Sequence, residues 1–160
     1  MFRRLIQTSN DPMLALLRFA LGAVFFAHGA QKVLGWFGGA GFASTMSYLG
    51  HMGIPAFFAF LVCIAEFLGG IGLILGFLTR IAAFAIAIEM FVALFLVHIH
   101  NGFFMNWAGN KAGEGFEFHL LAIAIAVTLL VRGAGAFSFD HELEYSRPVP
   151  SHPYPQPLGG

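Results

Sequence analysis

Long apolar runs separated by short polar segments dominate the pattern along the chain. Four of these runs approach the roughly 20 apolar residues that cross the hydrocarbon core of a bilayer. They cover residues 13–33, 55–78, 81–97 and 116–131. The last run contains Glu117 and His119 near its start, so its outer turn is expected to face protein or water instead of lipid. The pattern predicts an all-α membrane protein that folds as an antiparallel bundle of four transmembrane helices.

The segments between the runs differ in length. Only residues 79–80 separate the second run from the third, which predicts a tight helical hairpin. The first loop is longer, residues 34–54, and within it Phe42, Met46 and Leu49 recur at helical spacing. Both a short helix lying in the membrane interface and an ordinary loop fit this spacing.

The two ends of the chain differ from its middle. Residues 1–12 are expected to form a short N-terminal segment, and residues 13–139 the transmembrane domain. From residue 140 to residue 160 the sequence "DHELEYSRPVPSHPYPQPLGG" has five prolines in its last thirteen residues. Because proline cannot continue a helix, this stretch predicts a disordered tail.

Composition excludes several classes of protein. Charged residues make up 10% of the chain and hydrophobic residues 58%, whereas about a quarter of a soluble domain is charged. The formal net charge is zero and there is no basic run, so nucleic acid is not an expected partner. Because the chain has one cysteine, Cys63, it cannot carry out dithiol exchange by itself.

The basic residues predict the orientation, since short loops rich in lysine and arginine stay in the cytoplasm. Those on the side of the termini are Arg3, Arg4, Arg80, Arg132 and Arg147, and those on the other side are Lys32 and Lys111. Both termini are therefore predicted to be cytoplasmic. Aromatic residues flank the spans on the outer side, as in a membrane belt: Trp36, Phe37, Phe103, Phe104 and Trp107.

Titratable side chains within the apolar runs fall into two tiers. Because a charge at mid-bilayer costs about 2.5–3.5 kcal/mol, these groups are expected to point inward and pair. The outer tier comprises His28, Lys32, His98, His100, Glu114, Glu117 and His119. The deeper tier comprises Arg18, Glu66 and Glu89, in which one arginine can neutralise one or both acids. The deeper tier fits either a functional role or a structural one that fixes helix register.

Helical geometry gives expectations for the first two runs. At about 100° per residue, Arg18, His28 and Lys32 share one face of the first helix. In the second run, Gly72 and Gly76 form a pair of small residues four apart, which allows close contact with another helix.

The same geometry orients side chains of the third and fourth runs. His100 lies within about 20° of Glu89, whereas His98 lies nearly opposite it, so His100 is the expected inward residue. Glu117 and His119 are about 200° apart, and only one of them can face the bundle centre.

The outer tier suits proton exchange coupled to electron transfer. Histidine exchanges protons near neutral pH, and a quinone headgroup needs such a donor or a lysine beside an aromatic wall such as Trp107. Two alternatives remain open. Haem could be ligated by His28 together with His98, His100 or His119, and histidines with carboxylates could bind a metal ion.

Three segments carry a resemblance to a known family. "RFALGAVFFAHGAQKVLGWFGG", "AEFLGGIGLILGFLTR" and "GFFMNWAGNKAGEGFEFHLL" resemble the DoxX family of small four-helix bacterial membrane proteins, over roughly residues 14–140. The resemblance implies a place in the bacterial inner membrane and redox work as a subunit or partner of oxidoreductases, one relative being part of a thiosulfate:quinone oxidoreductase. The matched positions that it emphasises are Arg18, His28, Lys32, Glu66, Arg80, His98, Glu114 and Glu117.

Together these observations predict an integral membrane subunit of a quinone-linked oxidoreductase, working with a redox protein partner or as a homo-oligomer. His28, Lys32, His98 and Glu117 would line the headgroup pocket, and Glu66 and Glu89 would relay protons. Whether the chain is catalytic alone stays open. The alternatives are a non-catalytic scaffold that recruits soluble redox enzymes, and a small transporter or proton pathway.

Overall fold

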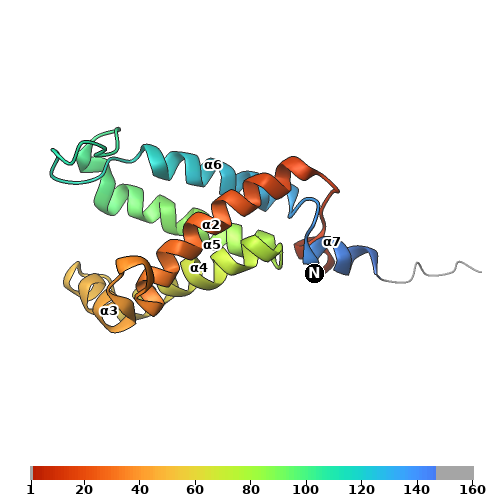
Figure 1. Cartoon of the computed structure of the whole chain (residues 1–160), viewed down its shortest axis with the longest axis horizontal. Helices are drawn as coiled ribbons and strands as arrows, with labels where there is room; N and C mark the ends of the chain where they lie inside the picture. Colours follow the sequence, from red (N-terminus) through yellow and green to blue (C-terminus); the bar gives the residue numbers. More distant parts are fainter. Residues whose placement is uncertain (1, 147–160) are drawn as a thin grey trace, which may run out of the picture.

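The computed structural model describes residues 2–146, and within them the regular elements are all helices, with no β-strand. The long helices are α2 (Pro12–Leu34), α4 (Ala56–Leu75), α5 (Thr79–Ala93) and α6 (Glu117–Arg132) (Figure 1). The short ones are α1 (Phe2–Ile6), η1 (Trp36–Gly38), α3 (Gly41–His51), η2 (Leu94–His98), η3 (Ile99–Asn101) and α7 (Phe139–Tyr145). The expected all-α class is confirmed.

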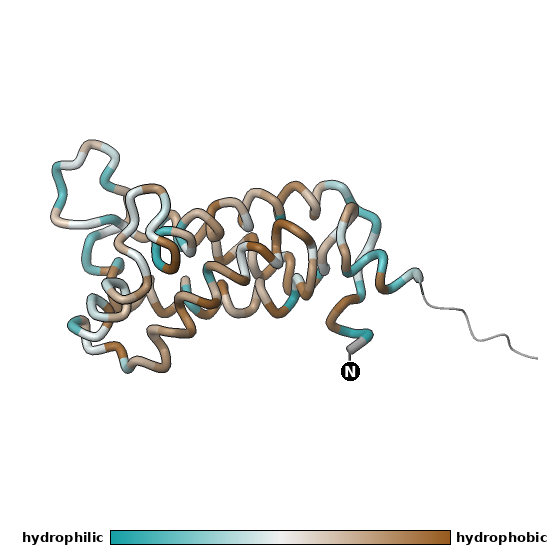
Figure 2. Tube along the Cα trace, turned by 60° about the horizontal axis from the view of Figure 1, so that its bottom comes forward, coloured by the Kyte–Doolittle hydropathy of each residue, from teal (hydrophilic) through white to brown (hydrophobic). Residues whose placement is uncertain are grey.

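Three stretches are long and apolar enough to cross a membrane: α2, α4 and residues 79–101, in which α5, η2 and η3 follow one another. Figure 2 shows apolar residues along the long helices and polar residues gathered at both ends of the molecule. With 16 residues, α6 is shorter than the roughly 20 that a span usually needs. Three of the four expected spans are thus supported, and the fourth remains a prediction.

The long helices pack as two pairs. α2 lies mainly against α4 and α5 mainly against α6, while contacts of α4 with α5 and of α2 with α6 join the pairs. Apolar side chains of all four helices form one core, which includes Leu21, Phe25, Leu73, Ile86, Met90, Ala126 and Leu129. This arrangement places the polar side chains of α2, α4 and α5 between helices.

Glycines allow the backbones of α2 and α4 to approach closely. A Cβ atom on Gly29 would lie 2.4 Å from the Phe67 nitrogen, and one on Gly70 would lie 2.4 Å from the Phe26 nitrogen. Of the two glycines that the sequence singled out, Gly76 ends α4 with a φ of 67° and allows Ser138 to approach closely, and Gly72 faces Ala82 of α5. The helix contact therefore uses Gly29 and Gly70.

Local signals explain where α2 begins and ends. The Asp11 side chain accepts a hydrogen bond from the Met13 nitrogen, Pro12 occupies the first turn, and Gly35 ends the helix in the left-handed conformation. The connection between α4 and α5 is residues 76–78, because Thr79 already begins α5. The expected hairpin connection at residues 79–80 is therefore displaced by about one turn.

The first loop contains the helix that its spacing allowed. α3 covers Gly41–His51 and contacts both α2 and α4. The alternative of an ordinary loop is therefore wrong for this segment.

Both described ends of the chain lie at one end of the molecule, where α1 contacts α7 (Figure 1). The Thr8 nitrogen donates a hydrogen bond to Glu144. The expectation of a disordered tail from residue 140 is wrong for its first residues. Ser138 caps α7, and buried Asp140 accepts hydrogen bonds from two backbone N–H groups at the start of α5. The rest of that expectation, residues 147–160, lies outside the described residues.

Candidate functional site

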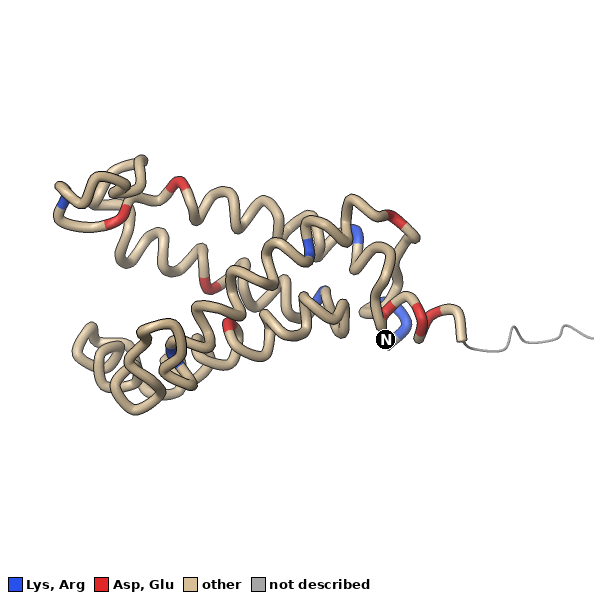
Figure 3. The backbone as a smooth tube through the Cα atoms, in the orientation of Figure 1, with Lys and Arg blue, Asp and Glu red and all other residues tan. Residues whose placement is uncertain are grey.

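A partly buried ion pair joins α2 to α4. The Lys32 Nζ donates a hydrogen bond of 2.5 Å to the Glu66 Oε2. The exposed fraction of the side chain is 28% for Lys32 and 6% for Glu66, so the pair is accessible from the lysine side. Figure 3 shows how few charged residues interrupt the long helices. The pair of Lys32 and Glu66 is the one ion pair between side chains within residues 2–146.

A second carboxyl joins this pair from α5. Glu89 lies close enough to Glu66 for the charge of one carboxyl to affect the other, and the Glu89 Oε2 is buried without a hydrogen-bond partner in the described chain. The buried thiol of Cys63 lies one turn before Glu66 on α4. One ammonium balances one carboxylate, so the cluster of Lys32, Glu66 and Glu89 is neutral only when one carboxyl holds a proton.

Arg18 does not belong to this cluster, contrary to the expected deeper tier. Its guanidinium donates to the carbonyl oxygens of Leu73 and Ile74 at the end of α4. It also donates to three carbonyls in the segment that follows α6, those of Ala134, Ala136 and Phe137. The prediction that Arg18 neutralises Glu66 or Glu89 is wrong. Sequence could not reveal this, since backbone carbonyls occur at every residue.

Two histidines, one on η2 and one at the start of α6, meet at the end of the bundle far from the chain termini. The rings of His98 and His119 have centroids 4.0 Å apart at an angle of 38°. The His98 Nδ1 lies 2.9 Å from the Glu114 carbonyl oxygen. His119 is buried, and its Nδ1 has no partner among residues 2–146. This histidine pair is separate from the carboxyl cluster.

The expectation that His100 points inward is wrong. His100 is exposed, and His98 takes the inward place. The prediction assumed a continuous α-helix, whereas the chain forms the π-helical segment η2 over Leu94–His98 and the 3₁₀ turn η3 after it. A π-helix turns less per residue than an α-helix, so it changes the direction of every later side chain.

The acidic residues of the outer tier stabilise the loop between η3 and α6. The Glu117 Oε1 accepts hydrogen bonds from the Met105 nitrogen and from the Trp107 ring nitrogen, at 2.9 and 3.4 Å. The Glu114 Oε2 accepts one from the Asn106 nitrogen. The expected difference in direction between Glu117 and His119 is confirmed, since the histidine is buried and the glutamate contacts this loop. Trp107 is 88% exposed and forms no wall of a pocket.

The outer tier therefore separates into two groups instead of lining one chamber. Lys32 joins the carboxyl cluster, and His98 joins His119. His28 is exposed on α2, although it lies one turn from Lys32 as expected. The reason is that the outer ends of the two helix pairs, with the loops that follow them, lie apart (Figures 1 and 2).

The side chains of the described residues fit the haem and metal alternatives poorly. The haem alternative paired His28 with His98, His100 or His119, but His28 is exposed on α2, whereas the rings of His98 and His119 lie against each other. Within residues 2–146, no three side chains of histidine, cysteine, aspartate or glutamate lie together as metal ligands would.

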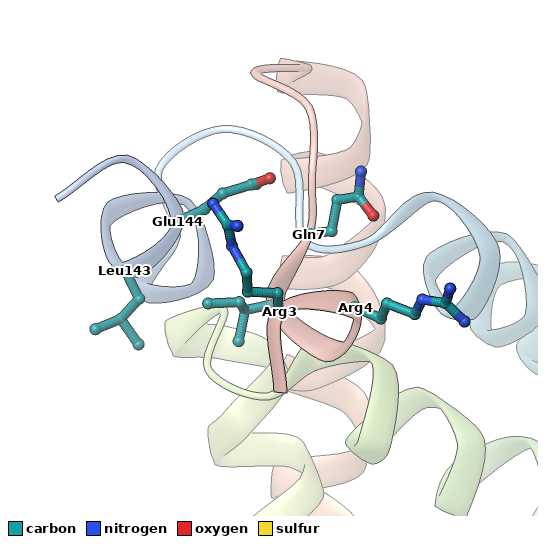
Figure 4. A pocket seen from close by; sticks show the side chains of 6 residues that line it. Arg3, Arg4, Gln7, Leu143 and Glu144 are labelled. Carbon is teal, nitrogen blue, oxygen red and sulfur yellow. The ribbon is translucent and has the colours of Figure 1, made fainter. Parts of the chain in front are cut away.

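Two hollows of the surface lie at the opposite end. One, of about 300 Å³, is lined by Arg3, Arg4, Ile6, Gln7, Leu143 and Glu144 (Figure 4). A neighbouring hollow of about 350 Å³ is lined partly by Arg4 and Arg80. Sequence reasoning used these arginines only for orientation. Their position beside a hollow depends on how α1 folds back onto α5, for which the sequence has no signal.

Comparisons with known proteins agree with this membrane fold. A family model described as DoxX matches residues 13–99. The chain is 32% identical over 91 residues to "Putative oxidoreductase CatD" of Bacillus subtilis (strain 168), a match that covers 57% of this chain and 63% of that protein. It is 41% identical over 64 residues to "Inner membrane protein YqjF" of Escherichia coli (strain K12), covering 40% of this chain and 49% of that protein. The matches thus span less than two thirds of either relative. No solved structure matches.

Proposed function

Because the chain belongs to the DoxX family of membrane proteins, we propose that it is a membrane subunit of a quinone-linked oxidoreductase. In this proposal the cluster of Lys32, Glu66 and Glu89 exchanges protons with a quinone headgroup or a similar small redox molecule. The printed name of the Bacillus relative supports a link to redox chemistry. The observation that carries the proposal is a second carboxyl, that of half-buried Glu89 with its buried Oε2, beside an ion pair that is already complete.

Stability alone does not require this second carboxyl. A buried carboxyl with an oxygen that lacks a partner costs free energy, and ionisable groups at membrane depth usually serve proton or substrate transfer. Glu89 can hold the proton that makes the cluster neutral and can give it up when the charge nearby changes. Because 28% of the Lys32 side chain is exposed, a headgroup would approach the cluster from that side.

Reduction of a quinone at this site would use both the carboxyl groups and the ammonium group of the cluster. Reduction of a quinone to a quinol takes up two electrons and two protons. A partner redox protein would supply the electrons, and the Glu66 and Glu89 pair would pass protons to the headgroup oxygens. The Lys32 ammonium would stabilise negative charge that develops on one of those oxygens.

The proposal includes a four-helix transmembrane arrangement in the bacterial inner membrane, with both termini in the cytoplasm. The printed name of the Escherichia relative supports the inner membrane. The contact of α1 with α7 supports a common side for both termini. Basic residues concentrate at that end, as the rule for cytoplasmic loops requires: Arg3, Arg4, Arg80 and Arg132.

Binding of a short-chain quinone analogue tests the site. The full-length protein would be purified in detergent micelles and titrated with the analogue, with tryptophan fluorescence and calorimetry as readouts. Glu89→Gln keeps the shape of the side chain but cannot carry an exchangeable proton. We expect it to weaken binding about tenfold, which corresponds to about 1.4 kcal/mol, and to remove the pH dependence of binding.

Glu114→Gln is the matched control, because it neutralises an exposed carboxylate of the outer loop. Its affinity should equal that of the wild-type protein. Circular dichroism and gel filtration would confirm that both variants fold. Unchanged binding by folded Glu89→Gln would contradict the assigned site. If the wild-type protein binds no quinone analogue but still captures a redox enzyme after the cluster is replaced, the scaffold alternative takes its place.

A further inference from the structure

A second feature lies at the cytoplasmic end of the proposed arrangement, where α1, α5 and α6 meet. The hollow of about 350 Å³ found there is lined by Arg4, Leu5, Arg80, Ile81, Phe84 and Leu130. Its lining therefore combines two cations with four apolar side chains and includes no acid. The name "arginine groove" is used below for the hollow that these six residues form.

Arg80 is held rigidly at the wall of the arginine groove. Its Nη1 donates to the Leu130 carbonyl oxygen, and its Nη2 and Nε donate to the Gln7 carbonyl oxygen at 3.0 and 3.4 Å. A guanidinium has five N–H donors, so these three hydrogen bonds leave two. Carbonyl oxygens do not neutralise the positive charge. Arg80 is thus a positioned cation without a carboxylate partner in the described chain.

Arg4 provides a second cation that has no partner. It is exposed and makes no hydrogen bond or ion pair with the other described residues. Figure 4 shows Arg3 and Arg4 pointing in opposite directions from α1, Arg3 toward Glu144 and Arg4 away from it. Because Glu144 faces Arg3 and not Arg4, it does not neutralise the positive charge of the arginine groove.

The apolar residues of the groove lie where the helices enter the membrane. Ile81 and Phe84 follow Arg80 in the first turns of α5, and their exposed fractions are 46% and 52%. Arginine side chains at the ends of spans reach the level of the lipid headgroups, and apolar residues beyond them face the acyl chains. The arginines of the groove therefore lie where the headgroup of a phospholipid would lie, and its apolar residues lie where the acyl chains would lie.

We propose that the arginine groove binds one anionic phospholipid of the leaflet on the side of the termini. Its phosphate would lie between Arg4 and Arg80, and an acyl chain would lie along Ile81 and Phe84. Basic pockets between membrane helices on the cytoplasmic side are known to accept such headgroups. A free phosphate ion would satisfy the two arginines but would leave the apolar wall uncovered. The lipid fits both parts, and it would hold α1 against α5.

Native mass spectrometry of the full-length protein tests this proposal. The protein in detergent micelles would be titrated with phosphatidylglycerol, and separately with phosphatidylcholine that has the same acyl chains. We expect one phosphatidylglycerol to be retained per chain, at concentrations about tenfold lower than phosphatidylcholine needs. Arg4→Gln should weaken retention about fivefold, the effect of one cation near a charged lipid surface. This variant disturbs no hydrogen bond in the described chain.

Arg80→Gln would also lose three hydrogen bonds, so Arg80→Lys serves beside it as a variant that keeps the charge. Arg132→Gln is the matched control, because this exposed arginine at the same end does not line the groove. It should retain the lipid as the wild-type protein does. Equal retention of both lipids, or wild-type retention by Arg4→Gln, would overturn the proposal. Displacement of the lipid by millimolar inorganic phosphate would assign the site to a free anion and overturn it as well.

Discussion

Lys32 and Glu66 form a 2.5 Å ion pair across the contact between α2 and α4. These two helices make the most extensive helix–helix contact of the described chain. The pair therefore combines two roles: it fixes how α2 and α4 lie against each other, and it places a charged group beside Glu89. The two roles have different experimental signatures.

The structural role predicts a loss of stability when one partner is removed. Lys32→Met would leave the buried Glu66 carboxylate without its cation, and Glu66→Gln would leave the Lys32 ammonium with only Glu89 nearby, and we expect the free energy of unfolding to fall by about 3 kcal/mol. This is the lower end for buried pairs, because part of the Lys32 side chain is exposed. Unfolding by denaturing detergent in mixed micelles would measure the change. The double variant should lose less than the sum of the two single variants, and strict additivity would contradict the coupling.

The glycine contact between α2 and α4 predicts an intolerance of even one methyl group. In Gly29→Ala the new Cβ would lie 2.4–2.7 Å from backbone atoms of Glu66 and Phe67, and no side-chain movement relieves that. We expect a loss of about 3 kcal/mol, since overpacking a close contact costs about this much. The same unfolding assay applies. Gly50→Ala in α3 is the control, because its Cβ would meet nothing within 4 Å and alanine favours a helix. Equal effects of the two variants would disprove the close contact.

The buried guanidinium of Arg18 predicts that lysine cannot replace it. Arg18 donates to five carbonyls of α4 and the segment after α6, whereas an ammonium has three donors and no planar fork. Arg18→Lys should lower the free energy of unfolding by about 2–3 kcal/mol. It should also make residues 133–138 easier to cleave by limited proteolysis. The exposed Arg132→Lys should change neither quantity, and a wild-type cleavage pattern in Arg18→Lys would argue against this role.

Asp140 predicts a specific dependence of stability on pH. Burial raises the pKa of its carboxyl above 3.8, although the N–H groups of Thr79 and Leu78 and the charge of Arg18 act in the other direction. The folded chain therefore binds this proton more tightly than the unfolded chain does. Its contribution to stability is complete below pH 3.8 and is lost as the pH rises through the raised pKa.

The comparison of wild-type protein with Asp140→Asn isolates that contribution. Between pH 3 and pH 7 the wild-type free energy of unfolding should lose an increment that the variant, which cannot titrate there, does not lose. Chemical unfolding at several pH values would measure the difference between the two curves. Curves that stay parallel over this range would show that Asp140 has an ordinary pKa.

The long helices were predictable because the residues within and beside each apolar run indicate a helix. The apolar run at residues 13–33 has Asp11 and Pro12 before it and Gly35 after it, and α2 begins and ends within about one residue of that run. The helical spacing of Phe42, Met46 and Leu49 likewise marked α3. These signals depend on neighbours in sequence, so a single sequence is enough to read them.

The residues whose positions were predicted wrongly depend on contacts between distant parts of the chain, which a single sequence does not reveal. α7 forms because Asp140 reaches the start of α5, and the prolines that follow concealed this short helix. Arg18 binds backbone carbonyls, which every residue has. His98 replaced His100 because η2 interrupts the α-helical repeat. The sequence placed Glu66 and Glu89 in one tier, since both lie near the middle of adjacent antiparallel helices.

The order of Lys32 and Glu66 along the chain also affects how the helices are inserted into the membrane during synthesis. An isolated acidic residue at the middle of a newly made helix costs about 2.5–3.5 kcal/mol to transfer into lipid. α2 is synthesised before α4 and already carries the cation that Glu66 requires. Insertion of α4 is therefore easiest while α2 is still beside the lateral gate, and the biogenesis of the second span depends on the first.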